Sequence, residues 1–462
     1  MVSVGTRVDL HILPFCSVFY LFSLLDRSNV GNAELQGLSE DIGLKGHQYN
    51  TGLTLFYVAY AVFGWSSNIM LRHMSPRYWL LGLMVAWGVV TALTGIIQNH
   101  QGFYAVRFFL GAFEAGMFPG LTYALSQWYL PSEMRERQHY FYCSTSLAGV
   151  LGGLLAFLLA KMDGIAGLEK WRWLFIIEGC ATVALALTLL PFAQDYPENA
   201  GFLDPIEKQE IIQKVGRNVH GQDTKLCHKL RMADVKKVLT DHFSCLHMLV
   251  YLCLNSVVYG FTLFLPMFMK GIGVPAKIIP LLTMPIYGTG TVCSVLIVKF
   301  LSDRGRAFPA LLLCLGLMFT GFIVVGCMGT SFHRGVAYAM CYLVSIGIYG
   351  SVPTSTAWFG SHMAGKQHKD LATGLHFTVG GMGGVIASNI YRQQDKPVFQ
   401  VGNFTQAGLL ALSFLAVIII RLAENRARKK STFQTYQTYQ TFDNTTENST
   451  YDSPEDAVIP PT

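Results

Sequence analysis

The sequence predicts an all-α membrane protein of twelve transmembrane helices, arranged in two halves of six. The 462 residues are 52% hydrophobic and only 13% charged, whereas a soluble domain carries roughly 25% charged residues. Apolar stretches of about 20 residues, the length that crosses a bilayer, follow one another along almost the whole chain. A single long polar interval, residues 196–241, separates six of these stretches from the other six.

The predicted spans follow directly from these stretches. Those of the first half lie at 10–31, 50–71, 78–98, 103–128, 139–160 and 171–193. Those of the second half lie at 243–268, 278–301, 307–328, 335–358, 371–391 and 404–423. Asp9 and His11 stand at the start of the first span and no small-residue cleavage site follows it, so we interpret it as an uncleaved helix and not a signal peptide.

Four segments result from this pattern. We predict a first six-helix half at 1–195, a cytosolic central loop at 196–241 and a second six-helix half at 242–424. Residues 425–462 are polar and repetitive without apolar periodicity, which predicts a disordered cytosolic tail. Two six-helix halves around a site near the middle of the bilayer are the layout of secondary transporters.

Basic residues in alternate short loops predict the orientation. They are Arg72, Arg77, Arg135, Arg137, Arg304, Arg306, Lys366 and Lys369. The central loop and the end of the last span add more, and the intervening loops are sparser. The positive-inside rule then places both termini and the central loop in the cytosol, and we expect the plasma membrane. The same bias accounts for the net charge of +6 without a nucleic-acid partner.

The sequence contains no complete motif for catalysis, metal binding or nucleotide binding. The ten cysteines are scattered and form no CxxC pair. The stretch Gly360–Gln367 has P-loop spacing but lacks the hydroxyl residue that ligates magnesium, and it follows a membrane span. The glycines at 380–384 lie inside an apolar span, where they allow helices to approach closely. The sequence therefore predicts no enzyme, no cofactor and no metal site.

Ionisable residues inside the predicted spans are the main functional candidates. Such a residue at a helix centre costs roughly 2.5–3.5 kcal/mol, so those that remain usually face a polar cavity. The candidates are Asp26, Arg27, Arg107, Glu114 and Glu178. Span directions place Asp26, Arg27 and Arg107 near the outer surface and Glu114 near the midplane.

Helical spacing suggests how these charges are partnered. Arg107, Gly111 and Glu114 share one helix face, but seven residues separate the two charges by about 10 Å. We therefore predict that Arg107 pairs with Asp26 across helices. This leaves Glu114 for a proton, a substrate or a polar neighbour, and a bundle-ordering hydrogen bond is an equal alternative.

Further candidates are less specific. Asn29, Asn255, Tyr259, Tyr349 and His376 are polar or aromatic residues on the predicted substrate and proton pathway, although each is also consistent with packing. The loop after the eighth span contains the charged residues Asp303, Arg304 and Arg306. They are predicted to hold the ends of neighbouring helices together in one conformation of the transport cycle. Asn403 begins an N-x-Thr sequon and is a glycosylation candidate if it is accessible.

Several motifs carry a resemblance to a known family. The stretches LDRSNVGNA, VRFFLGAFEAGMFPG, WRWLFIIEG and LCLNSVVYG resemble the fungal anion:cation symporter branch of the major facilitator superfamily. That branch includes allantoate, nicotinate, pantothenate and biotin permeases, and the resemblance runs from about Arg7 to Lys430. It implies proton-driven uptake of a small organic anion by alternating access. Departures at Gly64, Ser66, Ser361 and His362 imply an altered cavity.

The leading hypothesis is a monomeric carrier in which Arg27 or Arg107 attracts the anion and Glu114 carries the proton. Its partners are then a small-molecule substrate, a co-transported proton and the lipid bilayer. An exporter of a secondary metabolite is an alternative, although the fifth span lacks the Gly-Pro pair usual in antiporters of the superfamily. A nutrient sensor is a third alternative, which deletion of residues 431–462 would separate from a carrier.

Overall fold

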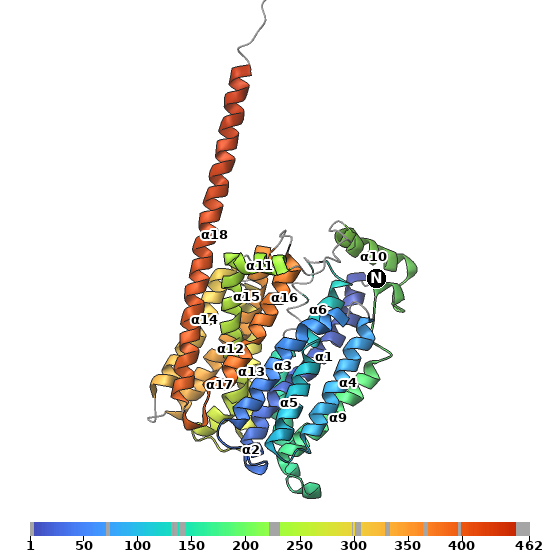
Figure 1. Cartoon of the computed structure of the whole chain (residues 1–462), viewed down its shortest axis with the longest axis vertical. Coiled ribbons are helices and arrows are strands. Elements are labelled where there is room, and N and C mark those ends of the chain that lie inside the picture. The colour runs from blue at the N-terminus through green and yellow to red at the C-terminus, as the bar shows by residue number, and fades with distance from the viewer. Residues whose placement is uncertain are drawn as a thin grey trace, which may run out of the picture.

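The computed structural model describes residues 4–70, 74–130, 133, 137, 144–220, 232–297, 299–300, 306–328, 333–363, 368–395 and 399–449. Long helices make up nearly all of the regular structure in these ranges (Figure 1). They form two bundles that lie side by side, one from each half of the chain. The predicted all-α fold in two six-helix halves is confirmed.

The first half consists of α1 (Val4–Leu35), α2 (Leu38–Asp41), α3 (Gln48–Met70), α4 (Pro76–Thr94), α5 (His100–Glu114), α6 (Met117–Ser126), α8 (Ser144–Leu159) and α9 (Lys170–Leu189). Short 3₁₀ turns follow α8 at Ala160–Met162 and Ile165–Gly167. The second half consists of α12 (His242–Gly271), α13 (Ile279–Ile297), α14 (Ala307–Met328), α15 (Arg334–Met363), α16 (Lys369–Gly381), α17 (Gly383–Ile390) and α18 (Gln400–Ser449). Between the halves lie α10 (Pro205–His220) and α11 (Met232–Thr240).

Two predicted spans are each built from two shorter helices. The span predicted at 103–128 is α5 followed by α6, and the span predicted at 371–391 is α16 followed by α17. In the part of the chain that is described, nine helices are long and apolar enough to cross a membrane. The other three spans of the fold are α3, the shorter α8 and the interrupted pair α16 and α17.

The two ends of the bundle are distinct in Figure 1. One, here called the α10 end, carries the beginning of α1 together with α10 and α11. The opposite one, here called the α2 end, carries α2 and the turns after α4 and before α9. Arg7 is paired with Glu207, and Lys214 Nζ lies 2.7 Å from Glu133 Oε1. These pairs attach α10 to the first half.

The two halves are hydrogen-bonded to each other at the α2 end. The Asn50 side chain of α3 donates to the carbonyl oxygens of Ser388 and Tyr391, at 2.6 and 3.0 Å. Thr54, one turn further along α3, lies 3.1 Å from the Ser388 hydroxyl and accepts a hydrogen bond from Asn389 at 2.9 Å. These hydrogen bonds join α3 to α17 where both helices approach the α2 end.

Glycines allow close helix approaches, as predicted for the glycines at 380–384. A Cβ at Gly111 of α5 would lie 2.2 Å from the carbonyl oxygen of Phe56 on α3. A Cβ at Gly383 would lie 2.6 Å from the carbonyl oxygen of Leu252 on α12. Any side chain at these positions would push the helices apart.

The tail departs from the prediction. Residues from 425 onward were predicted to be disordered, but α18 continues as a helix to Ser449 and extends beyond the α10 end (Figure 1). Glu424 anchors the helix just past its last apolar turn, since it accepts hydrogen bonds from Trp358 at 3.0 Å and Arg421 at 2.8 Å. The part of α18 beyond residue 424 thus begins at a turn that Glu424 fixes to α15.

Candidate functional site

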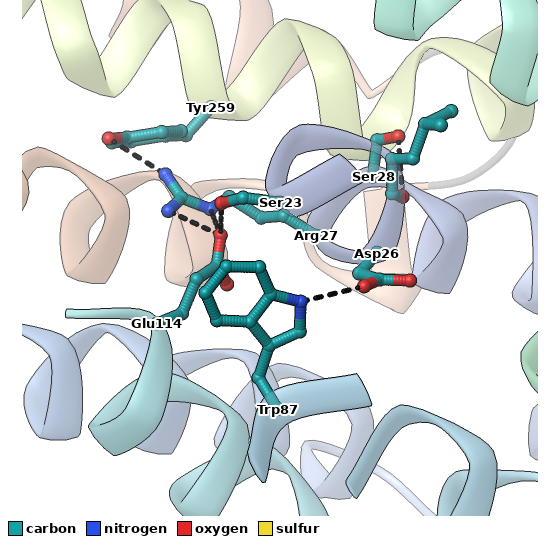
Figure 2. Close-up of polar contacts among 8 residues, drawn as sticks. Ser23, Asp26, Arg27, Ser28, Trp87, Glu114 and Tyr259 are labelled. Atoms are coloured by element: carbon teal, nitrogen blue, oxygen red, sulfur yellow. Dashed lines mark hydrogen bonds and ion pairs between the residues drawn. The ribbon is translucent and has the colours of Figure 1, made fainter. Parts of the chain in front are cut away.

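An arginine and a glutamate form a buried ion pair at the centre of the first half (Figure 2). Arg27 of α1 approaches Glu114, the last residue of α5, with Nη2 at 2.7 Å and Nε at 3.0 Å from Oε1. The Ser23 hydroxyl donates to the same oxygen. Ser23 lies one turn before Arg27 on α1, so both residues face α5. Glu114 is 0% exposed, so the pair is removed from water.

The break between α5 and α6 comes directly after Glu114. Pro119 has no backbone N–H, so it cannot donate to the carbonyl of Ala115, four residues before it. Gly116 lies against Ser67 of α3, since a Cβ there would meet the Ser67 hydroxyl. The helix therefore ends where the sequence stretch FLGAFEAGMFPG combines glycine and proline, and the ion pair sits at that end.

Asp26 faces away from this pair, although it is the neighbour of Arg27 in sequence. Its Oδ2 accepts hydrogen bonds from Trp87 of α4 at 3.1 Å and Thr182 of α9 at 3.3 Å. Consecutive residues of an α-helix point about 100° apart, so the two side chains reach different neighbours. Figure 2 shows Asp26 turned toward Trp87 and Arg27 turned toward Glu114.

The predicted pairing of Asp26 with Arg107 is therefore wrong. Arg107 lies over the ring of Phe56, 4.7 Å from its centroid, and is 2% exposed. Its Nε and Nη2 have no hydrogen-bond partner among the described residues. The prediction failed because Asp26 turns toward α4 and α9, whereas Arg27 turns toward α5 and meets Glu114 there.

Glu178 of α9 is a second buried carboxyl group near Asp26. It is 4% exposed, and within the described ranges neither of its oxygens has a hydrogen-bond partner. Thr182, which donates to Asp26, follows Glu178 by one helical turn, so both side chains face α1.

Aromatic rings surround Arg27 on the side away from Asp26. The guanidinium carbon lies 4.8 Å from the ring centroid of Tyr60, 5.4 Å from that of Phe56 and 5.9 Å from that of Tyr259. Tyr259 belongs to α12 of the second half, and its hydroxyl accepts a hydrogen bond from Arg27 Nη1 at 3.5 Å. Arg27 thus contacts both halves of the protein.

The remaining candidates lie apart from the ion pair. Asn255 donates to the Tyr251 carbonyl of its own helix at 2.9 Å. Tyr349 packs against Tyr287 at 6.4 Å between ring centroids, inside the second half. Asn29 is buried toward α8, 3.6 Å from the position of a Cβ at Gly152.

His376 is enclosed by aromatic residues. Its ring stacks on Tyr251 and on Phe359, each at 4.2 Å between centroids. It is 0% exposed, and neither ring nitrogen has a hydrogen-bond partner in the described part of the chain. Its place on α16, against α12 and α15, is toward the α10 end from Tyr259.

Two further predictions concern the charged residues after the eighth span and the glycosylation candidate Asn403. Asp303 and Arg304 lie outside the described residues, and Arg306 is exposed before α14. Asn403 lies in the first turn of α18 and is 4% exposed. The condition set for its glycosylation, accessibility of the side chain, is therefore not met in this structure.

Sequence reasoning missed several residues that build the site. They are Ser23, Phe56, Tyr57, Tyr60, Trp87 and Thr182. Ser23 carried a usable signal, because it precedes Arg27 by four residues and shares its helix face. The others lie on different helices, so only the packing of those helices brings them to Arg27 or Asp26.

Known proteins of similar sequence and structure are membrane transporters. The sequence profile of the Major Facilitator Superfamily matches residues 16–388. An uncharacterized transporter of Schizosaccharomyces pombe is 31% identical over 427 residues, which are 92% of this chain and 84% of that protein. The high-affinity nicotinic acid transporter of Saccharomyces cerevisiae is 27% identical over 430 residues, which are 92% of this chain and 78% of that protein.

A solved structure shares the fold. The proton:xylose symporter XylE of E. coli, bound to 6-bromo-6-deoxy-D-glucose, superposes with a TM-score of 0.69 at 16% identity, covering 90% of this chain and 95% of that chain. At this identity, the similarity concerns the arrangement of the helices.

Proposed function

Since the chain belongs to the Major Facilitator Superfamily and is a membrane transporter, we propose that it takes up a small organic anion together with a proton. The observation that carries this proposal is the buried pair of Arg27 and Glu114. The same arginine that would bind a carboxylate is already occupied by an internal one. A nicotinic acid transporter among the relatives and the resemblance to anion:cation symporters support the same class of substrate.

The coupling follows from competition for one guanidinium group. While Glu114 is ionised, it holds Nε and Nη2 of Arg27 through Oε1. A proton on Glu114 removes its charge and weakens both bonds, because charge-assisted hydrogen bonds are roughly twice as strong as neutral ones. An incoming carboxylate then takes the released donors. The anion binds when Glu114 is protonated, so the two ligands move together.

A count of buried charges predicts the stoichiometry. Of the Asp, Glu, Lys and Arg side chains in the described ranges, five are buried: Asp26, Arg27, Arg107, Glu114 and Glu178. We propose that Glu178 is protonated, because both of its oxygens are buried without a hydrogen-bond partner in the described ranges, and two carboxylates then balance two arginines. A monovalent anion would add a negative charge to this low-dielectric interior, at high cost. One proton on Glu114 restores the balance, so we propose one proton for each anion.

Alternating access determines the side of the membrane on which the anion and the proton are released. The hydrogen bonds of Asn50 and Thr54 support a conformation that is closed at the α2 end and releases substrate at the α10 end. We propose that the α10 end is cytosolic, because the basic loops and the central segment belong to it. The helix breaks after Glu114 and at Met382 provide points at which spans can bend.

Uptake by the intact protein tests this proposal. Radiolabelled nicotinate and benzoate would be offered to permease-deficient yeast at external pH below the cytosolic pH, with and without a protonophore. Accumulation should require the pH gradient and should be lost in Arg27→Gln. Glu198→Gln, which changes an exposed glutamate of the central segment, is the matched control and should accumulate normally. Surface expression of every variant would be measured in parallel.

Two outcomes would contradict the proposal. One is normal accumulation by Arg27→Gln, which would remove the arginine from the substrate site. The other is the absence of uptake of any panel member together with reduced retention of an endogenous metabolite, which would favour export.

A further inference from the structure

We propose that the transported anion is a planar aromatic or heteroaromatic monocarboxylate, whose carboxylate binds Arg27 and whose ring stacks among tyrosines of both halves. This inference rests on the proposed function and adds to it the chemistry of the part of the substrate beyond the carboxylate. Three features of the structure support it: the rings around the guanidinium group, the rings that continue from it along the boundary, and the partial exposure of several of these rings.

The first feature is the number of rings that face Arg27. Tyr60, Phe56 and Tyr259 lie within 5.9 Å of the guanidinium carbon, measured to ring centroids. Tyr57 continues the group, at 4.8 Å from Tyr259 and 5.0 Å from Phe56. Tyrosines in such a site supply flat apolar surface with a polar edge. A planar ring attached to an Arg27-bound carboxylate would find stacking partners on its faces.

The second feature is that aromatic residues continue from Arg27 toward the α10 end, away from the arginine. Tyr20 lies 5.8 Å from Phe118, and Phe118 lies 5.0 Å from Phe377 of the second half. Phe377 in turn lies 5.7 Å from Tyr251, measured between ring centroids. Stabilising a buried arginine would require rings only next to the guanidinium group. The additional rings line the boundary between the halves along the direction of release.

The third feature is the degree of burial. Arg27 and Tyr57 are buried, but Tyr60, Tyr259, Phe118 and Phe377 remain partly exposed. Their ring surfaces are therefore incompletely covered by protein in this conformation. Partly exposed aromatic surface at the boundary between two moving halves favours contact with an apolar ligand.

The predicted ligand is monovalent because the arrangement presents one cation with a displaceable partner. Arg27 can exchange Glu114 for a carboxylate, whereas Arg107 is 2% exposed and lies against the ring of Phe56 at 4.7 Å. Both arginines lie over the ring of Phe56, but of the two only Arg27 contacts both halves among the described residues. In that part of the chain, a second carboxylate would have no equivalent partner at the boundary.

Matched acids separate the aromatic preference from anion binding itself. Benzoate and cyclohexanecarboxylate carry the same charged group on a six-membered ring, flat in one and puckered in the other. 1-Naphthoate and its decahydro analogue form a larger pair. Binding of each acid to the purified full-length protein in nanodiscs would be measured by thermal shift and by tryptophan fluorescence. We expect each aromatic acid to bind about tenfold more tightly than its saturated analogue.

Variants assign the preference to specific rings. Tyr60→Leu should reduce the ratio of aromatic to saturated affinity severalfold, whereas Tyr60→Phe should retain it because the ring remains. Tyr104→Leu, at a half-buried tyrosine of α5 whose ring contact is with His100, is the control and should leave the ratio unchanged.

The possible results distinguish the aromatic preference from the anion site at Arg27 on which it rests. Equal affinity for flat and saturated acids, lost in Arg27→Gln, would refute the aromatic preference and leave the anion site standing. The same would follow if Tyr60→Leu kept the full preference. Failure of all four acids to bind the wild-type protein would contradict both the preference and the proposed anion site.

Discussion

Replacement of Glu114 by glutamine should uncouple anion binding from pH. In the wild-type protein, Arg27 donates two charge-assisted hydrogen bonds to Glu114 Oε1, at 2.7 and 3.0 Å, and Ser23 donates a third bond to the same atom. A bound carboxylate must replace this ionised partner, and one proton neutralises Glu114 when it does. Linkage of a single proton changes the binding free energy by about 1.36 kcal/mol per pH unit.

The sign follows from the direction of proton movement. Binding takes up a proton, so affinity for benzoate should fall about tenfold for each unit by which pH rises over the range where Glu114 is ionised in the free protein. In Glu114→Gln no proton is needed, so affinity should be independent of pH. It should also exceed that of the wild-type protein at the higher pH, because the neutral amide competes less strongly for Arg27.

Binding would be measured by isothermal titration calorimetry in nanodiscs across about two pH units, with Glu198→Gln as the control that keeps the wild-type slope. Removing one partner of a buried pair costs about 3–5 kcal/mol, so the variant should also melt at lower temperature. Benzoate should recover part of that loss by supplying a new carboxylate. A wild-type affinity that does not change with pH, or a Glu114→Gln protein that keeps a tenfold change per unit, would refute the reasoning.

Three further predictions concern the surrounding helices. Gly111→Ala would place a Cβ 2.2 Å from the Phe56 carbonyl oxygen and should lower the free energy of unfolding by about 1–3 kcal/mol; Gly82→Ala, where a Cβ meets nothing within 4 Å, should change little in the same thermal melts. Asn50→Ala removes two hydrogen bonds to α17, so thiol labelling of a cysteine introduced at Thr54 should increase severalfold, whereas the same cysteine in the wild-type background should stay protected. If Glu178 is neutral, as its burial without a hydrogen-bond partner led us to propose, Glu178→Gln should transport within about twofold of wild type. The infrared band of a buried carboxylic acid should also disappear, and an unchanged band would contradict this assignment.

Apolar periodicity predicted the helices well because a span must satisfy its backbone internally, whatever its neighbours are. The break inside the span at 103–128 was not predicted, although Gly116 and Pro119, which lie at it, are visible in the sequence. The length of α1 was underestimated because Asp9 and the residues around Asn32 are not apolar. That error occurs at both ends, so the midpoint of α1 hardly moves and the wrong pairing has another cause.

Side-chain partners across helices were the part that the sequence could not supply. Asp26 and Arg27 are adjacent, and the sequence alone leaves open which of them faces α5. The rotation of α1 settles this by turning Asp26 to Trp87 and Thr182. Tyr259 is 232 residues from Arg27 in sequence, so their contact depends on the docking of the two halves.

The central claim is that exchange of partners at Arg27 links one proton to one anion. Proteoliposomes that contain the full-length protein, an entrapped pH dye and radiolabelled benzoate would give both fluxes in the same vesicles. The flux of neutral benzoic acid across the lipid, which itself carries one proton per benzoate, would be measured in protein-free vesicles and subtracted. After this subtraction, we expect the two initial rates to be equal in the wild-type protein, and we expect Glu114→Gln to exchange benzoate without moving protons. Benzoate uptake by wild-type protein with no accompanying acidification, or proton movement that persists in Glu114→Gln, would contradict the account.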